Sequence, residues 1–197
     1  MRKLQLSLCF LALLLPSCSP RDFLNRRLAA DLIAGSNSFR TIQQFQLRIG
    51  VVSNEEYLSP ESAVLQHHGW VTATRAACTP DVAPPPCWDL ELSPLGVDTF
   101  QPLIPPSESE KKSITILTAK RELVLVTGIA REGINAEVDF TWRWNPLNEV
   151  GAALYRSDLR YRSTAALRRY DDGWRLAAPP HPLQYLDDSL KDSEPSK

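Results

Sequence analysis

Residues 136–144 read A-E-V-D-F-T-W-R-W and alternate apolar and polar side chains without interruption. Successive side chains of a β-strand project from opposite faces, so this period of two predicts a half-buried strand. Its apolar face carries Phe140, Trp142 and Trp144. Three large aromatic side chains on one face need an apolar surface to pack against. We therefore expect this strand to lie at the centre of a sheet.

The flanking sequence supplies neighbours for this strand. Downstream, residues 163–170 and 174–177 are two strand-like runs joined by Asp171-Asp172-Gly173. An Asp-Gly step between such runs is typical of a β-hairpin, because glycine accepts the positive φ of a tight turn. Upstream, residues 121–130 form a β-branched run followed by a turn at Arg131-Glu132-Gly133. Residues 114–177 are thus predicted to form an antiparallel, curved meander sheet.

Composition sets the protein class. Of 197 residues, 43% are hydrophobic and 23% are charged, which is ordinary for a globular protein. The net charge of −1 gives no electrostatic reason to expect nucleic-acid binding. The predicted fold class is α+β, with an N-terminal helix and hairpin subdomain followed by the antiparallel sheet. Composition shifts and proline clusters divide the chain into a signal peptide, the helix/hairpin subdomain, a linker, the sheet subdomain and a disordered tail: 1–17, 18–104, 105–112, 113–185 and 186–197.

The N-terminus has the features of an export signal. A basic start, Met1-Arg2-Lys3, precedes an apolar run over residues 4–15 that is too short to span a bilayer. The run ends in Leu15-Pro16-Ser17-Cys18, which resembles the lipobox of bacterial lipoproteins. This resemblance implies cleavage before Cys18, a diacylglycerol on its Sγ and an acyl chain such as palmitate on the new amine. The alternative is an ordinary secretory signal in which Cys18 occurs by chance.

The same resemblance places the protein in the bacterial cell envelope, bound to the membrane through its N-terminal lipid. Ser19 stands where an Asp commonly retains such proteins at the inner membrane, so we expect an outer-membrane anchor facing the periplasm. Several acyl chains give stable anchoring where one chain would be marginal. Cleavage would remove Arg2 and Lys3 and leave 20 basic and 23 acidic residues, a net charge of −3.

The remaining cysteines predict a disulfide. Cys9 lies in the signal and Cys18 is the lipidation candidate, which leaves Cys78 and Cys87 as a pair in an exported chain. A metal or redox pair is the alternative. The spacing is far from C-x-x-C, and no His lies between the two cysteines.

The N-terminal half predicts helices and a hairpin. We expect a helix within residues 20–36, a strand over 40–52, a helix over 59–68, and strands over 70–76 and 88–92. Residues 64–70, V-L-Q-H-H-G-W, and 92–96, L-S-P-L-G, resemble the third helix and wing of winged-helix domains. The resemblance implies the scaffold alone, because this helix is not basic and an exported protein does not meet the chromosome.

The C-terminal hairpin suggests a second likeness. Residues 171–176, D-D-G-W-R-L, resemble the last strands of the nuclear-transport-factor-like cone fold. That resemblance implies a long curved sheet that cups a helix.

Catalytic and metal-binding patterns are not found in the sequence. It contains no H-E-x-x-H, G-x-S-x-G, P-loop or G-x-G-x-x-G, and we predict no catalytic residue, metal or cofactor. His67 and His68 are adjacent on a predicted helix and point about 100° apart, so they are not expected to chelate one ion. A solvated last helical turn explains both residues.

Four residues are candidates for binding. Asp139 and Arg143 lie on the polar face of the central strand, and Asn148 and Glu149 follow Pro146 in an unusual loop. Capping of the segment after Pro146 by Asn148 or Glu149 is the structural alternative. The first functional hypothesis is a non-enzymatic lipoprotein that binds an envelope protein or a ligand. The second is a small-ligand carrier or enzyme of cone-fold type that uses the polar face, which requires a closed pocket.

Overall fold

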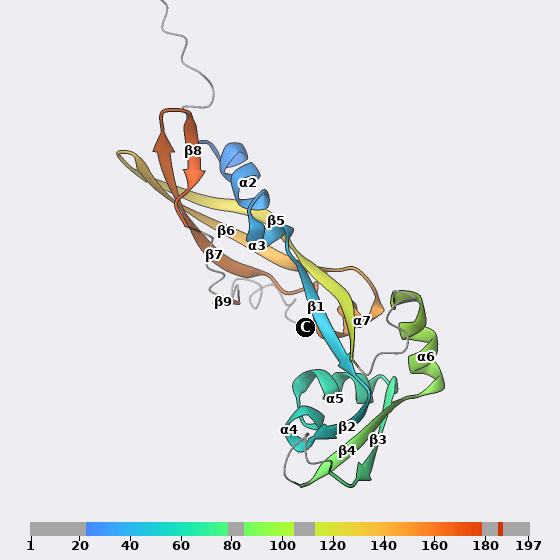
Figure 1. Ribbon diagram of the computed structural model, residues 1–197. Helices are drawn as coiled ribbons and strands as arrows, with labels where there is room; N and C mark the ends of the chain where they lie inside the picture. Colours follow the sequence, from blue (N-terminus) through green and yellow to red (C-terminus); the bar gives the residue numbers. More distant parts are fainter. Residues whose placement is uncertain (1–22, 79–84, 105–112, 179–184, 187–197) are drawn as a thin grey trace, which may run out of the picture.

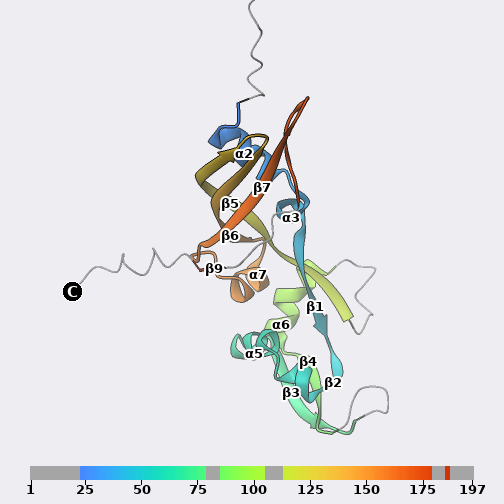
Figure 2. The same cartoon turned by 90° about the vertical axis from the view of Figure 1, so that its left-hand side faces the viewer.

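A computed structural model describes residues 23–78, 85–104, 113–178 and 185–186. It shows an elongated body with a large sheet at one end and a small sheet at the other (Figure 1, Figure 2). The large sheet is antiparallel, has six strands and curls into a half-barrel. The order of its main path is β1-β5-β6-β7-β8, and β9 pairs with β7. The predicted α+β fold with a curved antiparallel meander sheet is confirmed.

The strands of the large sheet follow the predicted hairpins. The turn after β5 contains Gly133, with φ +59°, and the turn after β7 leads to Gly173, with φ +124°. Register shifts in β5 at 123–125 and 126–128 mark bulges, which bend a sheet. The bounds of the strands are β1 Ile42–Arg48, β5 Ser113–Glu132, β6 Asn135–Pro146, β7 Tyr161–Tyr170, β8 Gly173–Leu176 and β9 Tyr185–Leu186.

Burial follows the predicted alternation along β6 except at Thr141, which the pattern places on the polar face but which is only 5% exposed. The apolar face of β6, predicted to need a covering surface, is between 0% and 7% exposed at Ala136, Val138, Phe140, Trp142 and Trp144. Two helices cover that face, α2 Arg26–Ala34 and α3 Asn37–Arg40. The ring of Phe39 in α3 meets Phe140 edge-on at 5.8 Å and Trp142 at 6.4 Å. The aromatic face is therefore the protein's own core and not an exposed interface.

Helix α2 begins where its sequence supplies a cap. The Asn25 side chain accepts a hydrogen bond from the backbone N–H of Leu28 at 2.8 Å, which satisfies one of the free donors at a helix start. Ala29 and Ile33 are fully buried against the sheet. The helix predicted within residues 20–36 is confirmed as an element that packs on the domain.

The single strand predicted over residues 40–52 is wrong. The structure divides it between the two sheets: β1 pairs with β5, whereas β2 Gly50–Ser53 pairs with β4. The chain changes direction at Gly50, whose φ is +94°. Alternating apolar and polar residues show only that one face of a strand is buried. The pattern is therefore the same whether residues 40–52 form one strand or two strands separated by a break.

The small sheet has the order β2-β4-β3. Its helix α5 starts as predicted, because the Ser59 hydroxyl accepts from the backbone N–H of Ser62 at 3.2 Å, and Gly69 after it has φ +69°. Helix α6 was not predicted. It begins with the same Ser-Pro signature, and the Ser93 hydroxyl accepts from the N–H of Gly96 at 2.9 Å. The remaining bounds are α4 Asn54–Tyr57, α5 Pro60–His67, β3 Val71–Ala76, β4 Cys87–Leu92, α6 Pro94–Phe100 and the 3-10 turn η3 Gln101–Leu103.

A second core joins the two sheets. It combines buried side chains of β1, β5 and helix α7 Glu149–Leu154 with those of the small sheet and its helices. Its members include Leu47, Leu65, Phe100, Ile116 and Val150, each at most 4% exposed. Residues on both sides of the predicted linker 105–112, which lies outside the described residues, thus share one core.

Replacing Gly151 by alanine is expected to destabilise the protein by about 1–3 kcal/mol, because overpacking forces the backbone to shift. A Cβ built on Gly151 would lie 1.9 Å from the carbonyl oxygen of Thr118 in β5. Urea unfolding measures the effect. Ala152 in the same helix is exposed, so Ala152→Gly should lose only the helix propensity of about 0.5–1 kcal/mol. A Gly151→Ala protein that is more stable than the parent would contradict this close packing.

Candidate functional site

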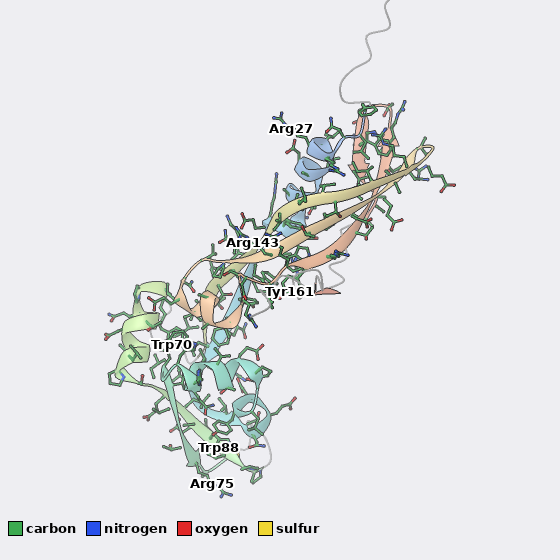
Figure 3. All side chains as sticks on the ribbon, turned by 180° about the vertical axis from the view of Figure 1, so that it is seen from behind. Arg27, Trp70, Arg75, Trp88, Arg143 and Tyr161 are labelled. Atoms are coloured by element: carbon green, nitrogen blue, oxygen red, sulfur yellow. A yellow bond between two sulfur atoms is a disulfide. The ribbon has the colours of Figure 1, made fainter. Side chains whose placement is uncertain are left out.

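The two candidate binding residues on β6 are engaged in pairs across the sheet. Arg143 Nε lies 3.0 Å from Glu122 Oε2 of β5, and both side chains are more than 40% exposed. Asp139 accepts a hydrogen bond from Thr164 Oγ1 of β7 at 2.9 Å. Both residues lie on the open, polar face of the large sheet, and Figure 3 shows Arg143 near the middle of the molecule. Exposed pairs of this kind contribute about 0–1 kcal/mol to stability.

The two candidates after Pro146 form the start of helix α7. Asn148 Oδ1 accepts from the backbone N–H of Gly151 at 2.8 Å, and its Nδ2 donates to the carbonyl of Leu117 at 2.6 Å. Asn148 is therefore the N-cap, as one of the two sequence interpretations predicted. Glu149 is exposed in the first turn, where a carboxylate is favoured by the helix dipole.

These four residues do not surround an enclosed space. Asp139, Arg143 and Glu149 are all exposed, and Asn148 supports the backbone. A carrier or enzyme built on them would need a closed pocket that excludes water. The arrangement provides surface charge and a helix cap instead.

A small pocket lies where the two sheets meet. Its volume is about 50 Å³, whereas sites for drug-sized ligands occupy about 300–1,000 Å³. It includes the Arg48–Glu56 ion pair, with Nη1 and Oε2 3.0 Å apart. Its wall combines β1, α5 and the small sheet: Phe45, Gln46, Leu47, Arg48, Glu56, Ser59, Glu61, Ser62, Leu65, Val71 and Leu90. This pocket is a gap between the elements that form the second core, and it is too small for a drug-sized ligand.

The shifted ionisations have structural causes. Burial lowers the pKa of Arg121, whose guanidinium lies 5.3 Å from the ring centre of Trp142 and 5.2 Å from that of Trp144. Burial likewise raises the pKa of Tyr155, next to Trp144, and of Tyr161, which stacks on Trp142 at 4.7 Å. All three groups border the aromatic core. Their shifts follow from packing against the indoles.

The described residues contain no group of three His, Cys, Asp or Glu side chains that could hold a metal ion. The rings of His67 and His68 are 5.8 Å apart and nearly perpendicular, at 86°. His68 stacks on Trp70 at 4.6 Å. The two histidines end helix α5, in the place the sequence predicted for them.

Cys78 and Cys87 form a disulfide, with their Cα atoms 5.2 Å apart. Cys87 is 1% exposed and opens β4, where it pairs with Ser53 on one side and Ala76 on the other. The predicted pairing is confirmed. The bond closes the connection between β3 and β4 at the free end of the small sheet.

The small-sheet end is strongly acidic, which the whole-chain net charge of −1 conceals. Residues 50–104 include one basic side chain other than histidine, Arg75, and seven carboxylates: Glu55, Glu56, Glu61, Asp81, Asp89, Glu91 and Asp98. We call the described residues of this segment, 50–78 and 85–104, the acidic unit. Of its described carboxylates, four are exposed: Glu55, Glu61, Glu91 and Asp98. Counting charge by segment would have revealed this feature from the sequence.

The acidic unit lies opposite the end where the described chain begins. Figure 3 shows Arg75 and Trp88 at one end of the molecule and Arg27, in the first turn of α2, at the other. The protein is therefore electrostatically polarised along its length. A charge distribution of this kind steers and orients a charged partner.

Searches against family models, curated proteins and solved structures found no match for this chain. None of the helices in the described part of the chain combines the length and hydrophobicity needed to cross a bilayer. The predicted signal peptide, Cys18, and residues 187–197 of the predicted tail lie outside the described residues. The lipobox-type sequence and the two fold resemblances stay predictions.

Proposed function

We propose that this protein is a non-enzymatic lipoprotein of the bacterial envelope, anchored through acylated Cys18 at the outer membrane and facing the periplasm. Its work is to bind another envelope protein. The acidic unit is the binding surface, and the large sheet is the support that holds this surface away from the anchor.

The separation of charge along the molecule carries this proposal. One end joins the segment that contains Cys18, and the other end has six described carboxylates against Arg75. Excess charge of one sign weakens the compact state through self-repulsion, so an acidic surface needs a reason beyond folding. A partner with a basic surface supplies one, because complementary potentials speed association and suppress wrong partners.

The engagement of the candidate polar residues favours binding over catalysis. Arg143 is paired with Glu122, Asp139 with Thr164, and Asn148 caps α7. None of these contacts gathers a nucleophile, a base and an orienting group around one reacting atom, which a catalytic site requires. A ligand carrier would show a ligand-induced rise in melting temperature, and that measurement tests the second hypothesis.

Charge reversal on the acidic unit tests the proposal. The full-length protein is purified from detergent-solubilised membranes of its host and used to recover bound proteins. Glu91→Lys together with Asp98→Lys should reduce recovery of a specific partner by about tenfold or more, where a factor of ten corresponds to 1.4 kcal/mol. Both residues are exposed, so the fold should be unaffected.

The matched control reverses two carboxylates elsewhere. Glu137 on the large sheet and Glu149 in α7 are also exposed, and their replacement by lysine changes the net charge equally. This control should recover the partner as the parent does. Equal losses from both variants, or no specific partner together with no ligand-induced melting shift, would contradict the proposal.

A further inference from the structure

The end of the large sheet where the described chain begins must lie near the membrane if Cys18 is acylated. Phe23 is the first described residue and follows Cys18 by five positions. A chain spans at most about 3.3–3.6 Å per residue, so the two lie within roughly 18 Å of each other. The present inference rests on the proposed lipid anchor and concerns which surface this short tether brings to the bilayer.

Exposed apolar side chains from three segments gather at this end. The guanidinium of Arg131 lies 4.5 Å over the ring of Phe23 and 5.9 Å from that of Trp174 in β8. The backbone N–H of Arg169 donates to the carbonyl of Ile134 at 2.7 Å, which holds the β5–β6 turn beside β7. Large apolar side chains stay exposed in each segment, with Phe23 at 64%, Ile134 at 51% and Tyr170 at 43%.

Arginines surround these side chains. Arg168 and Arg175 lie 5.8 and 5.4 Å from the ring centre of Tyr170. Three segments form this end: the first turn of α2, residues 131–134 and residues 168–175. Together they contain six arginines and only three carboxylates, those of Glu132, Asp171 and Asp172. One of these carboxylates, Asp172, is paired with Arg175. All six arginines are exposed, and we call them and the three apolar side chains the basic end: Arg26, Arg27, Arg131, Arg168, Arg169 and Arg175 with Phe23, Ile134 and Tyr170.

The placing of two of these arginines opposes local helix stability. Arg26 and Arg27 open α2, and its first turn holds no acidic residue. The positive end of the helix dipole favours carboxylates there and disfavours arginine. Arg26 donates to the carbonyl of Thr127 at 3.3 Å, while Arg27 points outward from α2 (Figure 3). Charges that cost helix stability are explained by an anionic partner outside the protein.

We propose that the basic end docks on the anionic phospholipid surface of the membrane that holds the anchor. Arginines are attracted to anionic headgroups, and aromatic rings are favoured at the boundary between headgroups and acyl chains. The acidic unit at the opposite end is repelled by the same surface. Docking would therefore set the protein upright, with the acidic unit directed away from the bilayer.

Quenching by brominated lipid tests this orientation. The full-length lipoprotein carrying Tyr170→Trp is reconstituted into brominated vesicles of phosphatidylcholine, with or without phosphatidylglycerol. The emission added by the new tryptophan should be quenched more strongly when phosphatidylglycerol is present. Leu58→Trp is the matched control, because Leu58 is 65% exposed in the acidic unit, and its added emission should not be quenched.

Charge reversal then tests the arginines. In the Tyr170→Trp protein, Arg27→Glu and Arg168→Glu should each weaken docking roughly fivefold or more, the factor for one arginine near an anionic surface. Arg75→Glu makes the same change of charge in the acidic unit and should have no effect. Arg27→Glu should also raise the melting temperature, since a carboxylate suits a helix start. Lost docking in a protein of greater stability cannot be ascribed to unfolding.

The outcomes separate docking from anchoring. Flotation with phosphatidylcholine vesicles reports the lipid anchor, because these vesicles have no net charge. If the protein floats with them while Tyr170→Trp is quenched no more than Leu58→Trp in phosphatidylglycerol, the docking proposal is overturned and the anchor stands. If it floats only with phosphatidylglycerol, and the two reversals abolish this, docking is supported and the anchor fails. If the protein floats with neither kind of vesicle, both the anchor and the docking proposals are overturned.

Discussion

Replacing Trp142 by alanine is expected to lower the free energy of unfolding by about 3–5 kcal/mol, the usual cost of removing a buried aromatic side chain. Trp142 is fully buried, and its Nε1 donates to Ser163 Oγ at 3.0 Å. Its ring contacts Phe39 in α3, Trp144 in β6 and Tyr161 in β7. The substitution thus removes the side chain that connects helix α3 to strands β6 and β7. Urea unfolding followed by far-UV circular dichroism measures the loss.

The size of this effect matters because domains of this kind are stable by only about 5–15 kcal/mol. The matched control is the next residue of the same strand, which faces the other way. Arg143→Ala removes the exposed pair with Glu122 and should cost less than about 1 kcal/mol. Similar losses from the two substitutions would mean that the aromatic face of β6 is not the core of the large sheet.

Replacing Cys18 by serine is expected to abolish lipid attachment entirely, because serine has no thiol to carry the diacylglycerol. A single 14-carbon chain gives a membrane association constant of about 10⁴ M⁻¹, and further chains make anchoring stable. Metabolic labelling with a fatty-acid analogue, followed by mass spectrometry of the N-terminal peptide, measures the change. The parent protein should begin at acylated Cys18, and the variant should carry no label.

Cys9→Ser is the control, since Cys9 lies in the apolar run that cleavage would remove. This variant should be labelled and processed as the parent is. A parent protein without label, beginning at some other residue, would show that the N-terminus is an ordinary secretory signal and would remove the basis for an anchored function.

Predictions from local sequence patterns succeeded where neighbouring residues decide the structure, as in the buried face of one strand, a tight turn or a helix start. The alternation in β6, the Asp-Gly hairpin after β7 and the Ser-Pro start of α5 all rest on neighbouring residues, and all are confirmed. The Asn148 cap belongs with them, because an N-cap is decided within one helical turn. The Cys78–Cys87 pair could be predicted by elimination once Cys9 was assigned to the signal and Cys18 to lipidation.

Predictions failed where the choice of partner decided the structure. The alternating run over residues 40–52 continues across Gly50, yet its two halves pair with β5 and with β4. Helix α6 follows the small sheet, and its Phe100 is fully buried in the core that both sheets share. Local sequence does not encode which distant surface will cover a side chain.

The candidate site shows the same division. The sequence identified Asp139 and Arg143 as charged residues on a polar face, but their partners Thr164 and Glu122 lie on neighbouring strands. Charge counted along residues 50–104 was available from the sequence alone. That this segment ends up opposite the beginning of the described chain is a property of the folded molecule.

The sequence by itself determined the type of most elements, the buried face of β6 and the disulfide, because each depends on residues close together in the chain. The lipid anchor also rests on a local pattern and stays a prediction. Only the tertiary structure decided that α2 and α3 cover the aromatic face, that one strand becomes two, and that arginines from α2, β5, β7 and β8 meet at one end. Such contacts join residues far apart in sequence. Each of these contacts depends on packing and charge in the whole folded molecule, which the sequence of one segment does not specify.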